Sequence, residues 1–126
     1  MELTLKFKGR FPSIDEYNNR KQESSFAAHN LKRKYQTIVL CEALGKGHYH
    51  FDTPVFISCR FYEKNKNRNF DAVSSFVHKI TQAALVEAKV IRDTGWGYVA
   101  GFKDEFFVDH KNPRVEVRIT EANEKP

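Results

Sequence analysis

Hydrophobic and polar side chains alternate along residues 2–8, where Leu3, Leu5 and Phe7 occupy every second position. A period of two residues is typical of a β-strand that buries one face and exposes the other. A second alternating segment covers residues 55–62, and apolar side chains occur there in both registers. Strands with apolar content on both faces are typical of the centre of a sheet, so we predict a central strand at this position.

Two longer segments follow the helical period of 3.6 residues. Apolar residues fall on one side of a predicted helix over residues 25–44, and Gly45 and Gly47 end that pattern. A second predicted helix begins near Asp71 and carries a wide apolar stripe as far as Ala88. Both helices therefore have a face suited to packing on a sheet.

The remaining segments complete the predicted domain. Residues 15–22 are polar and predict no more than a short helical turn, whereas residues 98–108 predict a short strand or hairpin. Residues 115–119 alternate again and predict a last strand. The order β-α-β-α-β indicates the α+β class, with a small mixed sheet and two main helices packed on it. We expect one domain over residues 1–121 and a polar C-terminal tail over residues 122–126.

The net charge and the cysteine content limit the kinds of function that the sequence allows. The net charge of +5 favours a polyanionic partner such as nucleic acid, although a basic domain without such a partner has the same composition. Cys41 and Cys59 form no CxxC pair and are expected to be buried free thiols. Together with His48 and His50 they match no standard zinc spacing. No leader-like or membrane-spanning apolar run occurs, so we expect a cytoplasmic protein.

Candidate chemistry is concentrated where the basic loop of residues 63–69 meets the second helix. Asp71 at this position could bind Mg²⁺, because Mg²⁺ prefers hard oxygen ligands. Phosphodiester cleavage through Mg²⁺ needs two or more converging carboxylates, and Asp93 in the loop after the helix is the second candidate. The alternative interpretation of Asp71 is a helix N-cap without any metal.

Three segments of the chain resemble RusA-type Holliday-junction resolvases, in particular the versions carried by phages and mobile elements of Gram-positive bacteria. GRFPSIDEYNN at residues 9–19 resembles the family segment G-R-L-P-S-x-N-E-Y. Residues 54–73 resemble its central strand, basic residues and D-x-D-N turn. Residues 90–119 resemble its D-D-x-W segment and its closing N-P-R-V-E-V strand. The likeness extends over residues 9–119, and it rests on the order of the segments more than on any single motif.

The resemblance implies a small α/β dimer that binds branched DNA and holds Mg²⁺ with three aspartates. The D-x-D motif reads Asn69, Phe70 and Asp71 in this chain, so one carboxylate is replaced by an amide. The later acidic pair reads Asp93 and Thr94, and Thr94 takes the place of the ligand nearest the Gly-Trp. Losing two negative charges weakens the attraction for a divalent ion. The predicted catalytic centre is therefore incomplete.

Two further groups of residues follow from the resemblance and from the distribution of basic side chains. The basic helix residue that assists cleavage in the family corresponds to Lys79, with His78 beside it. Phe70 and Trp96 could stack on opened bases, although a core or interface role is the simpler interpretation of Trp96. The residues predicted to contact DNA are Arg20, Lys21, Lys32, Arg33, Lys64, Lys66, Arg68 and Phe70, with Lys34 beside the helical pair. The alternative is that each basic run is a solvated face.

Three functions remain open from the sequence. The first is a catalytically impaired relative that binds branched DNA, or that is repurposed as an inhibitor of a host nuclease. The second is an active Mg²⁺-dependent junction endonuclease that uses Asp71 and Asp93, with Lys79 assisting. The third is a protein-binding module that has kept the fold without binding DNA.

Overall fold

Four strands form one mixed sheet in the computed structural model, which describes residues 1–122. The strands are β1 (Glu2–Lys8), β2 (Val55–Glu63), β3 (Val99–Val108) and β4 (Arg114–Glu121), in the spatial order β1-β4-β2-β3. β2 pairs parallel with β3 and antiparallel with β4, and β1 pairs antiparallel with β4. The predicted central position of β2 is confirmed, and β1 and β3 are the two edges.

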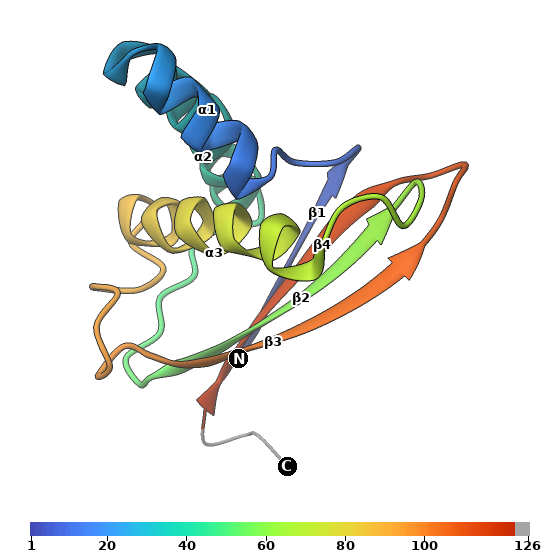
Figure 1. The fold of residues 1–126 in the computed structure, drawn as a ribbon. Coiled ribbons are helices and arrows are strands. Elements are labelled where there is room, and N and C mark those ends of the chain that lie inside the picture. The colour runs from blue at the N-terminus through green and yellow to red at the C-terminus, as the bar shows by residue number, and fades with distance from the viewer. Residues whose placement is uncertain (123–126) are drawn as a thin grey trace.

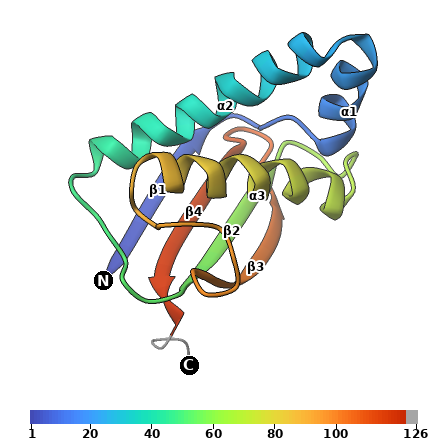
Figure 2. The same cartoon turned by 90° about the vertical axis from the view of Figure 1, so that its left-hand side faces the viewer.

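Three helices cover one face of this sheet, as Figures 1 and 2 show from two directions. They are α1 (Ile14–Glu23), α2 (Ser25–Gly45) and α3 (Phe70–Glu87). The α+β class is confirmed, and the element order is β-α-α-β-α-β-β. The prediction of two main helices was too low by one, since α1 is a third complete helix.

The helix α1 forms where the sequence predicted only a short turn. Ser13 caps it by accepting a hydrogen bond from the backbone N–H of Glu16, at 3.1 Å. Acidic residues lie in its first turn and Arg20 and Lys21 in its last, which is the favourable arrangement for the helix dipole. No residue of α1 is buried, so the helix has no apolar stripe that a periodicity analysis could detect.

The strand β3 is a single edge strand of 10 residues, not a short strand or a hairpin. The connection from β3 to β4 crosses the end of β2, because β2 lies between these two strands. Asp109 marks the crossing, where its N–H donates to the carbonyl of Glu63 at 2.7 Å. The loops at residues 64–69 and 109–113 are therefore neighbours, although they are about 40 residues apart in sequence.

The core lies between the sheet and the helices. Its fully buried side chains include Leu5 of β1, Ile57 and Phe61 of β2, and Phe76 of α3. Cys59 belongs to this core, whereas Cys41 is exposed on α2, so the prediction of two buried thiols was wrong for Cys41. Within residues 1–122, no helix is both long and apolar enough to cross a membrane.

The opposite face of the sheet is not covered by any of the three helices (Figure 1). Its arginines are paired with carboxylates: Arg60 with Glu105, Arg114 with Asp109 and Glu116, and Arg118 with Glu2. The guanidinium of Arg114 also lies 3.7 Å from the centroid of the Tyr62 ring, which stacks on Phe107. The arginines of this face are therefore compensated by carboxylates.

Candidate nucleic-acid interface

The predicted catalytic loop leads into α3, and Asp71 lies in the first turn of that helix. The N-cap is Asn69, which makes no capping hydrogen bond through its side chain. Asp71 is therefore not the cap, although its exposed carboxylate is favourably placed near the positive end of the helix dipole. Asn69 and Asp71 remain adjacent at the surface, as the sequence indicated.

Asp93 and Thr94 lie beyond the other end of α3. The backbone N–H groups of Val90 and Ile91 donate to the carbonyl of Leu85, which fixes the following loop to the last turn of the helix. A helix of 18 residues is about 27 Å long. A single chain therefore does not bring Asp71 and Asp93 together, and it does not form the predicted two-carboxylate magnesium site. The length of α3 is the physical reason for this correction, because the helix separates the loop that precedes it from the loop that follows it.

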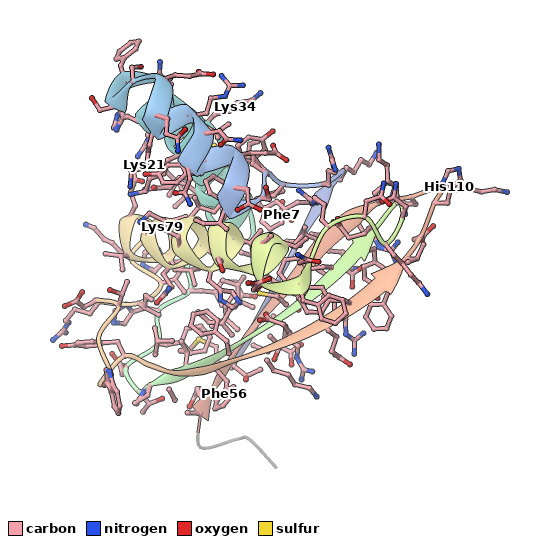
Figure 3. All side chains as sticks on the ribbon, viewed as in Figure 1. Phe7, Lys21, Lys34, Phe56, Lys79 and His110 are labelled. Atoms are coloured by element: carbon pink, nitrogen blue, oxygen red, sulfur yellow. The ribbon has the colours of Figure 1, made fainter. Side chains whose placement is uncertain are left out.

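Lys79 lies on the exposed side of α3, close to residues of the other two helices. Its Nζ atom is 5.8 Å from the centroid of the Tyr17 ring, and the Nζ atom of Lys21 is 5.3 Å from the same centroid. Lys21 and Lys32 line a surface hollow of about 270 Å³, together with His29. Figure 3 shows Lys21 and Lys79 on the same side of the helical layer. Three predicted residues thus gather in one helical basic patch, which consists of Lys21, Lys32 and Lys79.

Two arginines that were predicted to bind DNA are held by carboxylates instead. Arg68 donates two hydrogen bonds to Glu63, at 2.8 and 2.9 Å, and a third to the carbonyl oxygen of Phe11 at 2.7 Å. Arg33 pairs in the same bidentate way with Glu87, at 3.0 and 2.9 Å. The hydrogen bonds from Arg33 hold the pKa of the Glu87 carboxyl below its ordinary value. A phosphate would therefore have to compete with a carboxylate for either guanidinium, and DNA contact by Arg33 and Arg68 stays a prediction.

The other predicted DNA-contacting residues are at the surface. Arg20, Lys64 and Lys66 are exposed and make no ion pair with any carboxylate of residues 1–122. The Phe70 ring is 66% exposed and stacks on Phe106, with the ring centroids 4.0 Å apart. One face of the Phe70 ring is thus already occupied by a protein aromatic.

Trp96 does not belong to the core of this chain. Its side chain is 99% exposed, in the loop between α3 and β3. The core interpretation of Trp96 was therefore wrong. Its possible role in an interface or in base stacking stays a prediction.

A basic hollow lies between the edge strand β1 and helix α2. Its volume is about 720 Å³, and its lining includes four basic residues, Lys6, Lys8, Arg10 and Lys34. We call it the β1–α2 groove. None of these four side chains forms an ion pair with a carboxylate of residues 1–122.

One carboxylate, that of Glu42, also lines the β1–α2 groove. Its Oε2 atom accepts a hydrogen bond from the backbone N–H of Lys6 at 3.1 Å and lies 3.9 Å from the Nζ atom of Lys46. The aromatic rings of Phe7 and Tyr35 form part of the apolar lining. The groove therefore combines a strong positive charge with an apolar surface.

The residues predicted to contact DNA do not include Lys6, Lys8 or Arg10. The relevant signal was the run KFKGR at residues 6–10, in which three cations occur within five residues. That run was interpreted only as the polar face of a strand and its turn. Lys34 was noted beside Lys32 and Arg33, but α2 directs Lys32 and Lys34 to different hollows.

No model of a known protein family matches the chain, and no curated protein matches it. The resemblance to RusA-type resolvases accordingly stays a prediction from the sequence segments. The fold and the surface place the chain in a general class, that of two-layer α+β proteins with a basic groove at one edge of the sheet.

Proposed function

We propose that the protein binds nucleic acid and that the β1–α2 groove is its phosphate-binding surface. The observation that carries this proposal is that four basic residues line one groove and form no ion pair with a carboxylate of residues 1–122. Cations that have no carboxylate partner in the protein can exchange their counterions for phosphates, and the release of those counterions favours binding. Backbone contacts of this kind position a nucleic acid without reading its sequence.

The comparison with the uncovered sheet face supports the choice of the groove. Each arginine on that face is within 3.2 Å of a carboxylate oxygen. Binding a phosphate there would require those ion pairs to break. The groove has no such requirement, since its one carboxylate accepts from the backbone N–H of Lys6 and lies near Lys46, and it forms no ion pair with the four cationic side chains.

The resemblance stated above implies branched DNA as the preferred ligand, and we propose a DNA-binding protein that does not cleave. A single chain separates Asp71 from Asp93 by nearly the length of α3, so one subunit lacks a pair of converging carboxylates. Homodimerisation, also implied by the resemblance, would place a second groove on the other half of a junction. Sedimentation of the purified protein measures this directly, and a monomer at all accessible concentrations would contradict it.

The test compares two variants of equal net charge. In the groove variant, Lys8, Arg10 and Lys34 are changed to Gln, and in the control variant Arg92, Lys103 and Lys111 are changed to Gln. We expect the groove variant to bind a four-way DNA junction roughly 10- to 100-fold more weakly than the wild type, because three phosphate contacts are lost. We expect the control to bind almost normally. Equal losses in both variants would contradict the proposal.

A second arm of the same experiment adds Mg²⁺ and follows strand cleavage. We expect binding without nicking. Nicking that disappears in Asp71→Asn would contradict the non-cleaving function and favour the junction endonuclease.

A further inference from the structure

Three side chains with metal-binding atoms meet between the sheet and α3, away from the groove. Cys59 of β2 and Asp104 of β3 are register partners on adjacent parallel strands, so their side chains leave the sheet on the same face. His78 of α3 packs over them, with its Nε2 atom 2.9 Å from Oδ1 of Asp104. The sulfur, the imidazole nitrogen and the carboxylate oxygen all lie within 4.8 Å of one another.

From this geometry we propose that Cys59, His78 and Asp104 form a zinc-binding site. This proposal does not depend on the nucleic-acid function. Zn²⁺ is bound in proteins by thiolate, imidazole and carboxylate ligands at about 2.0–2.3 Å. Ligand atoms at the corners of such a tetrahedron are roughly 3.3–3.6 Å apart. The Nε2 atom of His78 and the Oδ1 atom of Asp104, now 2.9 Å apart, would separate by about 0.4 Å, and the sulfur of Cys59, which lies within 4.8 Å of both, would approach by no more than about 1.5 Å to reach a tetrahedral arrangement.

The ligand chemistry selects the ion. Mg²⁺ and Ca²⁺ prefer oxygen ligands, so a site with a thiolate and an imidazole disfavours them. On binding, the S–H bond of Cys59 breaks, its proton leaves to solvent, and the sulfur electron pair bonds to the metal. One thiolate and one carboxylate then balance the two positive charges of Zn²⁺. A site with no net charge is compatible with its largely buried position.

The surroundings of the cluster already orient its ligands. The His78 ring stacks on Phe102, with centroids 4.1 Å apart and planes 23° apart, which fixes the direction of the ring. Cys59 is almost completely buried, whereas the side chains of His78 and Asp104 each retain 22% exposure. The site is thus closed on its sulfur side and open to solvent on the other. Three protein ligands leave the fourth position for a water molecule.

Without a metal, His78 and Asp104 form a hydrogen-bonded pair beside the thiol. Burial, together with the nearby Asp104 carboxylate, raises the pKa of the Cys59 thiol. A His–Asp pair beside a thiol is the alternative explanation of the cluster, and it predicts no affinity for zinc. The two explanations therefore differ in a measurable property.

The experiment titrates metal-free full-length protein with Co²⁺, an optical probe for zinc sites, and then displaces it with Zn²⁺. We expect one equivalent per chain and a thiolate-to-cobalt charge-transfer band. The band should be absent in Cys59→Ser, and Zn²⁺ affinity should fall at least about 100-fold in Cys59→Ser, His78→Gln and Asp104→Asn, because each removes a direct ligand. Cys41→Ser is the matched control, because that thiol is exposed on α2, and it should change nothing.

Surface histidines can bind zinc weakly, and His50, which lies 3.2 Å from Asp52, is the obvious competitor. Binding at His50 gives no thiolate band and is removed by His50→Gln, so the two sites are distinguished. Circular dichroism establishes that each variant is folded. If Cys59→Ser does not fold, the partly exposed His78→Gln carries the test, with a Zn²⁺-induced rise in melting temperature in the wild type and none in the variant. Absence of the band in the wild type, or its persistence without Cys59, would overturn the proposal.

Discussion

Two bidentate arginine–glutamate pairs in this protein have the same geometry and different surroundings. The side chains of Arg68 and Glu63 are only 12% and 11% exposed, and Arg68 also binds the carbonyl of Phe11. The pair of Arg33 and Glu87 joins α2 to α3 at the surface, where the side chains are 46% and 37% exposed. Solvent and salt screen an exposed pair, whereas a buried carboxylate that loses its partner remains desolvated.

This contrast predicts unequal effects of two similar substitutions. Arg68→Ala should lower the free energy of unfolding by about 3–5 kcal/mol, because it leaves the Glu63 carboxylate buried and unpaired. Arg33→Ala is the matched control and should change stability little. Denaturant unfolding of the two variants measures the difference. Similar losses in both would show that the Arg68 pair is effectively solvated.

The two cysteines should react at very different rates in the folded protein. Cys41 is exposed on α2, whereas Cys59 is buried and its thiol has a pKa raised mainly by burial. Because the thiolate is the reactive form, an alkylating reagent should modify Cys41 first and reach Cys59 only after denaturant is added. Mass spectrometry of the native protein identifies the modified residue. Comparable rates at the two positions would contradict the packing of β2 beneath α3.

At the scale of elements, the sequence correctly predicted the helices and strands whose apolar residues recur at a regular spacing. The strand β1 matches residues 2–8, and α2 and α3 begin and end within about one residue of the prediction. The helix α1 was underestimated because it buries no residue, and its capping and charge pattern were the signals left unused. The strand β3 was predicted only as a short strand or hairpin, because none of its residues is fully buried and its alternation is weak.

The connection between β3 and β4 provides a prediction on pH. Asp109 accepts hydrogen bonds from the side chain of Arg114 and the backbone N–H of Asn112, and the Arg114 bond is the main cause of the lowered pKa of its carboxyl. A carboxyl whose pKa is lower in the folded state contributes stability above its unfolded value of about 3.9, and this contribution is lost as the pH falls further.

Asp109→Asn should therefore be less stable than the wild type at neutral pH, and the difference should shrink as the pH is lowered from about 6 to about 2. Melting temperatures measured across this range test the expectation. A difference that stays constant with pH would mean that the charge of Asp109 does not contribute to stability.

At the scale of the whole molecule, the candidate site depended on contacts that the sequence does not contain. Arg33 meets Glu87 across 54 positions, and this pairing exists only through the packing of α2 on α3. Cys59, His78 and Asp104 come together only through the register of β2 with β3. Asp71 and Asp93, in contrast, were expected to converge, and the rigid length of α3 keeps them apart.

The β1–α2 groove is also a feature of the whole molecule, because it forms only where the edge strand β1 lies beside α2. Lys34 lies on the opposite side of α2 from the helical basic patch, as Figure 3 shows for Lys34 and Lys21. One straight stretch of DNA would therefore contact one of these surfaces and not the other. The proposal assigns the phosphate contacts to the groove.

The salt dependence of DNA binding tests this assignment most directly, since each phosphate contact contributes about 0.9 to the slope of log K against log salt concentration. We predict that changing Lys8, Arg10 and Lys34 to Gln lowers the magnitude of that slope by about 2 to 3 relative to the wild type. The control with Arg92, Lys103 and Lys111 changed to Gln should keep the wild-type slope. An unchanged slope in the groove variant, or an equal loss in the control, would contradict the account.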